Sequence, residues 1–202
     1  MQLNMSSLSA VEAYATMTQS IVPRPVAWIL TQNDAPSFNL APFSYFNAVS
    51  SAPPMVMISC GMKPDGSVKD TRYNLEQRGE CVIHIAHTEL AKDMTASSAT
   101  FEQNVSEVDE LGLSLQEMAG YTLPRLAACR VAYQATLRDT KTIGFQWLGF
   151  LELTSLYLDE SVVGSDDKGR LKVMADKLSP IGRLGGGEYQ LAGDVISIDR
   201  PA

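Results

Sequence analysis

The sequence predicts one domain of the mainly β, α+β class, in which an antiparallel sheet or barrel carries a few inserted helices. Three observations predict it. Short β-branched and aromatic runs recur along the chain. The helical segments between them lack the regular strand–helix alternation of a doubly wound sheet. No repeat or linker divides the 202 residues, a length that can bury roughly 70% of its unfolded surface. We therefore treat residues 1–202 as a single domain.

The first half of the chain opens with a short helix and then turns to strands. Ser9 and Glu12 have the spacing of a capping box, which predicts a helix start. The IVPRP segment ends this helix, because proline lacks a backbone N–H. Gly79 is the type of residue that closes a helix. The expected strands cover 26–31, 44–49, 55–60 and 80–86, and the expected later helices cover 68–79 and 88–103.

The second half is expected to complete the sheet. Strands are expected over 130–138, 147–158 and 195–199, the second of these long enough to bend around a barrel. A helical stretch should follow the polar turn VGSDDKGR. Segment 101–117 has a local net charge of -5, because it carries five carboxylates and no Lys or Arg. Such a charge run predicts a solvated loop with a short helix, and a functional role for it is the weaker alternative.

Composition excludes several classes of protein. The net charge of -7 argues against nucleic acid as a partner, because phosphate backbones need clustered Lys and Arg. No apolar run approaches the ~20 residues of a membrane helix and no signal peptide is visible, so we expect a cytoplasmic protein without a membrane partner. Charged residues make up 19% of the chain, below the roughly 25% of typical domains. Either this is chance, or a partner subunit or ligand covers part of the surface.

The thiols and imidazoles do not form a recognisable catalytic or metal site. Cys60, Cys81 and Cys129 are isolated, and no CxxC pair is present. His84 and His87 are three apart in a predicted strand, so they should face opposite sides. We therefore assign no metal ligand and no catalytic side chain. Any redox chemistry is expected to belong to a bound cofactor.

Neither glycine-rich segment has the full pattern of a nucleotide-binding loop. In GMKPDGSV, Ser and Val stand where a P-loop requires Lys and Ser or Thr. RLGGGEY lacks the third glycine of the dinucleotide fingerprint, and no strand leads into it. A P-loop and a Rossmann site are both rejected, and the RLGGGEY run is then a flexible loop.

Two other segments are candidates for ligand binding. The first, 59–72, has a local charge of +1 and sets Lys69 and Thr71 at a helix start, an arrangement that suits a single phosphate. The alternative, which composition alone favours, is an ordinary helix cap with solvated lysines. The second, NLAPFSYFNAVSSAPP, combines small hydroxyls and amides near prolines, which suits the polar edge of a planar heterocycle. A turn-rich edge strand explains it equally well.

Five segments occur in an order that resembles a known family. They are IVPRPVAW, NLAPFSYFNAVSSAPP, KDTRYNL, GECVIHIA and PIGRLGGGEY, and they span nearly the whole chain. The sequence is similar to the flavin reductase-like, FMN-binding split-barrel family, in its flavoredoxin-type branch. The resemblance implies a six-stranded antiparallel Greek-key split barrel with flanking helices. It also implies a homodimer with FMN near the subunit interface. One departure is the loop QNDAPSFN, which lacks the glycine often found there.

The resemblance also implies which residues contact FMN. Asn39, Ser44 and Asn47 would line the isoalloxazine, with backbone contributing as much as side chain. Ser59, Lys69 and Thr71 would hold the phosphate, and Arg24 would add a cationic contact. Arg183 and Tyr189 would close over the site.

The resemblance implies an oxidoreductase, and three functions remain open at this point. The first is a flavin reductase that uses NADH or NADPH and passes electrons to a downstream acceptor, which could be a protein. The second is a flavoredoxin-like electron carrier without nicotinamide activity of its own. The third is a non-catalytic split barrel that binds another small ligand.

Overall fold

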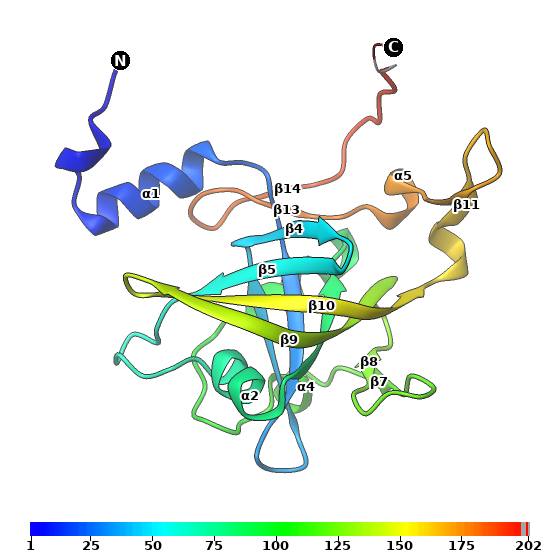
Figure 1. The fold of residues 1–202 in the computed structure, drawn as a ribbon, viewed down its shortest axis with the longest axis horizontal. Coiled ribbons are helices and arrows are strands. Elements are labelled where there is room, and N and C mark those ends of the chain that lie inside the picture. Colours follow the sequence, from blue (N-terminus) through cyan, green and yellow to red (C-terminus); the bar gives the residue numbers. More distant parts are fainter. Residues whose placement is uncertain (199–200, 202) are drawn as a thin grey trace.

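The computed structural model describes residues 1–198 and 201, and a seven-stranded antiparallel sheet dominates it (Figure 1). Its spatial order is β3-β2-β6-β9-β10-β5-β4. The bounds are β2 (Ala27–Gln32), β3 (Phe38–Phe43), β4 (Phe46–Ser51), β5 (Pro54–Cys60), β6 (Glu80–Ile85), β9 (Val131–Ile143) and β10 (Gln146–Leu158). The mainly β class is confirmed, with seven strands in this sheet where six were expected.

Smaller sheets surround the main one. β1 (Arg24–Pro25) pairs with β13 (Gly182–Arg183), which pairs with β14 (Tyr189–Gln190). The other two are hairpin-like pairs, β7 (Leu115–Gln116) with β8 (Arg125–Leu126) and β11 (Val163–Ser165) with β12 (Leu171–Val173). The β1-β13-β14 sheet brings residues 24–25 against the RLGGGEY segment.

The helices flank the sheet, and two of them have the capping residues that the sequence predicts. Ser9 and Glu12 form both hydrogen bonds of the capping box of α1. Gly79, with φ +75°, closes α2 in the left-handed region that glycine adopts without strain. The α-helices are α1 (Ala10–Ser20), α2 (Asp70–Arg78), α3 (Ala91–Ala96), α4 (Glu107–Glu110) and α5 (Ala175–Leu178). Single 3₁₀ turns occur at η1 (Met5–Ser7), η2 (Thr88–Leu90) and η3 (Glu160–Val162). In the described part of the chain, no helix is long and apolar enough to cross a membrane.

Two hydrophobic cores lie on opposite faces of the sheet, because side chains alternate along each strand. In β2, Ala27 and Ile29 belong to one core, whereas Trp28 and Leu30 belong to the other. The first core collects residues from β2, β3, β5, β6, β9 and β10 together with Leu75 of α2, and it forms the barrel interior. The second core packs the outer face beneath α3 and α4. Side chains that lie in space between β3 and α4 are therefore packed where the sheet meets the helix.

Register shifts explain how the long strands curve. β9 and β10 pair along most of their 13 residues each, with shifts at Phe150/Leu151 and Leu153/Ser155. Such bulges bend a strand and increase its twist. The expectation that the 147–158 strand bends around a barrel is thus confirmed. The turn between the two strands extends beyond the rest of the sheet (Figure 1).

One sequence-based expectation was open and two were wrong in part. The sequence leaves the strand over 38–43 undecided, because NLAPFSYFNAVSSAPP suits either a ligand-binding segment or a turn-rich edge strand; β3 lies at the edge of the sheet, where Pro42 is tolerated. The helix expected over 88–103 ends at Ala96, and a loop follows. No strand forms over 195–198, where the exposed segment has no strand neighbour to pair with, and residue 199 lies outside the described residues.

Candidate functional site

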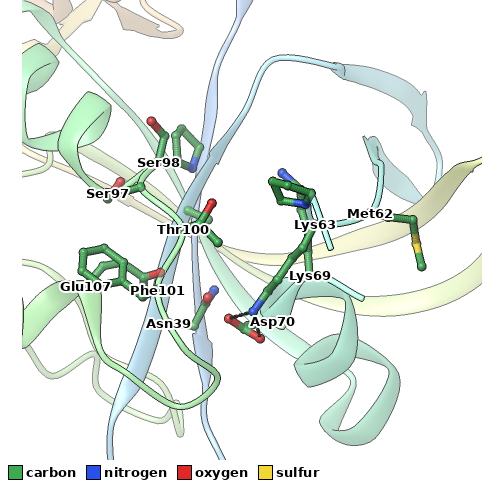
Figure 2. A pocket seen from close by; sticks show the side chains of 14 residues that line it. Asn39, Met62, Lys63, Lys69, Asp70, Ser97, Ser98, Thr100, Phe101 and Glu107 are labelled. Carbon is green, nitrogen blue, oxygen red and sulfur yellow. Dashed lines mark hydrogen bonds and ion pairs between the residues drawn. The ribbon is translucent and has the colours of Figure 1, made fainter. Parts of the chain in front are cut away.

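A small hollow opens between the sheet edge, α2 and the loop that follows α3 (Figure 2). We call it the cationic hollow; its volume is about 260 Å³. It is lined by Asn39, Ala41, Pro42, Met62, Lys63, Pro64, Lys69, Asp70, Ser97, Ser98, Ala99, Thr100, Phe101 and Glu107. The lysines and Asp70 lie on one side of it, and Ser97, Phe101 and Glu107 lie on the other. Segments far apart in the sequence therefore converge on one site.

Lys69 supplies the positive charge of this hollow. Lys63 also lines it, but its ammonium lies 2.9 Å from Asp70 in an ion pair. Lys69 forms no ion pair within residues 1–198 and 201, and its ammonium lies 5.7 Å from the centre of the Phe43 ring. It is also the N-cap residue of α2, so the free N–H groups of the first helical turn lie beside it. A cation at a helix N-terminus suits an anionic group.

Asn39 and Thr71 form a buried pair behind this charge. The Asn39 amide donates to the Thr71 hydroxyl over 2.9 Å and to the Thr31 hydroxyl over 3.3 Å. Asn39 lines the cationic hollow, whereas Thr71 is buried and lines none of the hollows described here. Thr71 therefore joins α2 to β3 through Asn39. Its expected direct contact with a phosphate stays a prediction.

A larger hollow of about 610 Å³ lies at the other end of the β3–β4 connection. We call it the apolar hollow, because Met17, Ile21, Pro23, Pro25, Phe46, Met57, Ile143 and Leu148 form most of its wall. Its polar lining is Ser44, Asn47, Ser59, Gln146 and Arg24, and Tyr45 also lines it. Ser59 donates to the Gln146 amide oxygen over 3.1 Å. The structure thus groups Ser59 with Ser44 and Asn47, and not with Lys69 as expected.

Arg24 is held by the protein itself. Its guanidinium donates to the carbonyl oxygens of Thr18, Ile21 and Leu184, and it approaches the Ser44 hydroxyl at 3.4 Å. These contacts tie the end of α1 and the 182–187 loop to β1. Arg24 lines the apolar hollow, whereas Lys69 lines the cationic hollow. The two cations that the resemblance assigned to the FMN site therefore lie in different hollows.

Arg183 and Tyr189 lie together on the β13–β14 hairpin. The Arg183 guanidinium sits 4.6 Å from the centre of the Tyr189 ring, and the Tyr189 hydroxyl accepts from Thr95 over 3.0 Å. Both residues line a third hollow of about 180 Å³, which also includes Tyr14, Val26, Pro42, Ser44, Met94 and Ser98. We call it the bridging hollow. It shares Pro42 and Ser98 with the cationic hollow and Ser44 with the apolar hollow.

The glycine run in this hairpin is a packed element rather than the free loop the sequence suggests. A Cβ on Gly182 would lie 2.6 Å from the Pro23 side chain, and one on Gly185 would overlap Gln19 of α1. The absence of side chains lets the hairpin approach α1 closely. The hairpin that carries Arg183 and Tyr189 is therefore fixed above Pro42 and Ser44.

Sequence reasoning missed Glu107 and the loop residues 97–100. Glu107 was expected in a solvated acidic run, yet it is 4% exposed and its Oε2 accepts the backbone N–H of Leu40 over 2.8 Å. Burial raises its pKa to about 7. A signal was present, because Glu107 lies between Val105 and Val108, and an apolar flank is unusual in a solvated carboxylate run. The loop residues were missed because the helix was extended through them.

The thiols and the buried imidazole take no part in the hollows. Burial raises the pKa of Cys60 to about 11, and lowers the pKa of His84 to about 4, so both are neutral at pH 7. His84 lies in the sheet, with Nδ1 facing the Trp28 carbonyl and Nε2 accepting the Leu126 N–H. These groups belong to the core rather than to a site of acid–base chemistry.

Comparison with known proteins identifies the class to which this fold and site belong. A model of the flavin reductase like domain matches residues 18–173. The uncharacterised protein BH2278 of Halalkalibacterium halodurans is 32% identical over 100% of this chain and 97% of its own. The 2-nitrobenzoate 2-nitroreductase NbaA of Pseudomonas fluorescens is 27% identical, with a TM-score of 0.88 over 100% of this chain and 96% of that one. Nitrilotriacetate monooxygenase component B of Bacillus cereus is 26% identical, with a TM-score of 0.87 over 98% of each chain.

The fold is the split barrel, which a solved structure of that description shares. The chain belongs to the flavin reductase-like domain family, and the protein is a flavin-related oxidoreductase. This confirms the family and the fold inferred from the five sequence segments.

Proposed function

We propose that the protein binds FMN, takes electrons from NADH or NADPH and passes them to a downstream acceptor. The observation that carries the proposal is the succession of hollows along Pro42–Ser44. A small hollow lies at one end, and its Lys69 forms no ion pair with the described residues; a larger apolar hollow lies at the other end. FMN combines a phosphate monoester with a planar ring system, so its two ends match the two environments.

The residues present fit such a group. Lys69 and the first turn of α2 would hold the phosphate, because both attract an anion. Ser44, Asn47 and Ser59 would contact the polar edge of the ring within an otherwise apolar wall. Arg183 and Tyr189 would cover the connection between the two ends from the β13–β14 hairpin. The hydrogen bond between Asn39 and Thr71 would support the site by holding β3 against α2.

The chain contributes binding, orientation and exclusion of water. Bound flavin supplies the hydride and electron transfer itself, so no side-chain acid or base is required. The apolar wall of Met17, Ile21, Met57 and Leu148 would keep water away from a bound ring once a second subunit covers its exposed side. Two similar structures support redox chemistry: one is named a nitroreductase and the other a component of a monooxygenase.

Anaerobic mixing tests the proposal. NADH or NADPH added to FMN-loaded protein should bleach the flavin absorbance near about 450 nm, a band that belongs to the cofactor. Colour that persists with both nucleotides but disappears with dithionite would contradict the reductase and support the flavoredoxin-like electron carrier. Colourless protein after FMN incubation and desalting would support the non-catalytic ligand-binding barrel.

We also propose that the protein is a homodimer. Large apolar side chains are exposed on α1 and at the β9–β10 turn, with Val11 at 77%, Ile21 at 57% and Phe145 at 88%. Ile21 and Ile143 also line the apolar hollow, so a second subunit over this face would enclose the ring site. A covered face also accounts for the low charged fraction of 19%. Light scattering should give twice the 22.0 kDa chain mass; a value at the chain mass would contradict the dimer.

A further inference from the structure

Glu107 places a buried carboxyl group in the wall of the cationic hollow. One carboxyl oxygen, Oε2, accepts the Leu40 N–H, and Leu40 lies between Asn39 and Ala41, both of which line the hollow. The structure records no hydrogen bond to the other oxygen, Oε1, from residues 1–198 or 201. Glu107 lies across the hollow from Lys69 and Asp70 (Figure 2). One oxygen is thus used by the fold, and the other remains available to a ligand.

The charge state of Glu107 decides the net charge of the hollow. The charged groups that line it are Lys63 and Lys69 of the 61–69 loop, Asp70 of α2 and Glu107 of α4. Lys63 and Asp70 compensate each other in their ion pair. With Glu107 ionised the sum is zero, and with Glu107 protonated it is +1. Within about 260 Å³, an ionised carboxylate would repel a phosphate dianion, whereas a carboxylic acid would donate a hydrogen bond to it.

We propose that Glu107 binds the ligand's phosphate group in its neutral form, so that this hollow takes up one proton from solvent together with the phosphate. The inference rests on the proposed function, because it assumes that the hollow holds the flavin phosphate. It goes further in making affinity for phosphorylated flavin dependent on pH. The neutral form is accessible, since burial, reinforced by Asp70, raises the pKa of Glu107 to about 7 against the opposing effects of Lys63 and the backbone amides.

Flavin binding at two pH values tests this inference. FMN and riboflavin affinities are measured by quenching of flavin fluorescence at about pH 7 and about pH 8.5, both above the phosphate's own second pKa of about 6. In the wild type, the FMN dissociation constant should rise about tenfold, because Glu107 loses its proton over this range. Riboflavin, which has no phosphate, should change less than about twofold.

Two variants separate Glu107 from other titrating groups. Glu107→Gln keeps an oxygen for the Leu40 N–H and cannot ionise, so its FMN affinity should change less than about twofold between the two pH values. Glu110→Gln removes the same charge from an exposed position of α4 and should behave as the wild type. An equal pH dependence in wild type and Glu107→Gln would overturn the inference.

A second measurement needs no variant. Calorimetric titration of the wild type in two buffers of different ionisation enthalpy counts the protons taken up. FMN should take up about 0.8 proton more than riboflavin at about pH 7.5, because a carboxyl group with a pKa of about 7 is about three-quarters ionised there. Equal proton counts for the two flavins would overturn the inference even if Glu107→Gln fails to fold. If riboflavin binds and FMN binds tightly at both pH values, the role of Glu107 is rejected but the proposed function stands. If neither flavin binds, the proposed function is rejected.

Discussion

Lys63 donates to both carboxylate oxygens of Asp70, each at 2.9 Å, and this ion pair joins the 61–69 loop to the first turn of α2. Both side chains are largely buried, at 14% and 13% exposed. The pair consumes one of the two lysine charges in the cationic hollow. The anion-binding capacity of this hollow therefore depends on Lys69, which a count of basic residues in the sequence does not distinguish from Lys63.

Replacing Lys69 should weaken FMN binding selectively. Lys69→Met keeps the length of the side chain but removes its charge, and a charge-assisted contact contributes about 1.5–3 kcal/mol. We expect the FMN dissociation constant to rise about tenfold or more and that of riboflavin to change little. Lys92→Met, at an exposed position of α3, is the control. Equal weakening of both flavins would contradict the assignment of the phosphate to this hollow.

Asn39→Ala should destabilise the fold. The substitution leaves the buried Thr71 hydroxyl without its amide partner, which costs about 1–3 kcal/mol, whereas the Thr31 hydroxyl still accepts from the Asn74 amide. Urea unfolding measures the free energy. Asn47→Ala, the same change at an exposed position, should cost less than about 0.5 kcal/mol. If the two variants are equally stable, the buried pair does not hold β3 against α2.

Glu107 should make the free energy of unfolding fall as pH rises. Its folded pKa of about 7 lies above its ordinary value of 4.5, so between these values the folded state binds the additional proton. The stability present below the ordinary value is therefore lost as pH rises towards 7. Relative to the wild type, Glu107→Gln should gain on the order of 2 kcal/mol between about pH 5 and about pH 8. Urea unfolding measures both free energies. If the free energies of unfolding of the wild type and Glu107→Gln differ by the same amount across this pH range, Glu107 is not desolvated.

His84 should make the protein sensitive to acid. Its folded pKa of about 4 lies below the ordinary 6.5, because its burial disfavours the imidazolium. The unfolded chain then binds the extra proton between these values, so the free energy of unfolding falls as pH drops through this window. The ring-proton NMR signal, assigned with His84→Gln, should stay at its neutral position at about pH 5.5. A titration midpoint of this signal near pH 6.5 would mean that the His84 ring is not buried.

Phe145→Asp should dissociate the proposed dimer. The side chain is 88% exposed at the β9–β10 turn, so its loss costs the isolated subunit little. A buried, unpaired carboxylate at a subunit interface is unfavourable. Light scattering should then report 22.0 kDa in place of twice that value. Asp139→Asn, an exposed change elsewhere on β9, should leave the mass unaltered. An unchanged mass for Phe145→Asp would place the interface elsewhere.

Local signals accounted for the elements whose ends are defined by a few neighbouring residues. The capping box at Ser9 and the terminal Gly79 predicted α1 and α2, because each motif satisfies free backbone groups within one helical turn. The β-branched runs predicted β2, β5 and β6, because branching at Cβ restricts χ1 and favours the pleated strand. The helix after Thr88 was overextended, because no strong stop signal follows Ala96 in the sequence.

Strand pairing and burial depend on partners far along the chain. The segment around Pro42 suited either a ligand-binding segment or an edge strand, and its pairing with β2 makes it β3 at the sheet edge, where proline is tolerated. Ile196 and Ile198 flank Ser197 with the alternation of a strand, yet no neighbouring strand reaches them in the described chain. Pattern alone does not supply the partner that a strand requires.

The sequence by itself determined the fold class and the family, because strand periodicity, caps and motif order are local, and eight of the nine site residues it singled out line one of the three hollows. Only the tertiary structure decided how those residues are grouped. It set Lys69 apart from Ser59, directed Arg24 to the protein's own carbonyl groups and buried Glu107 opposite Lys69. These outcomes depend on packing between β3, α2 and α4, and burial and charge compensation arise only when distant segments meet.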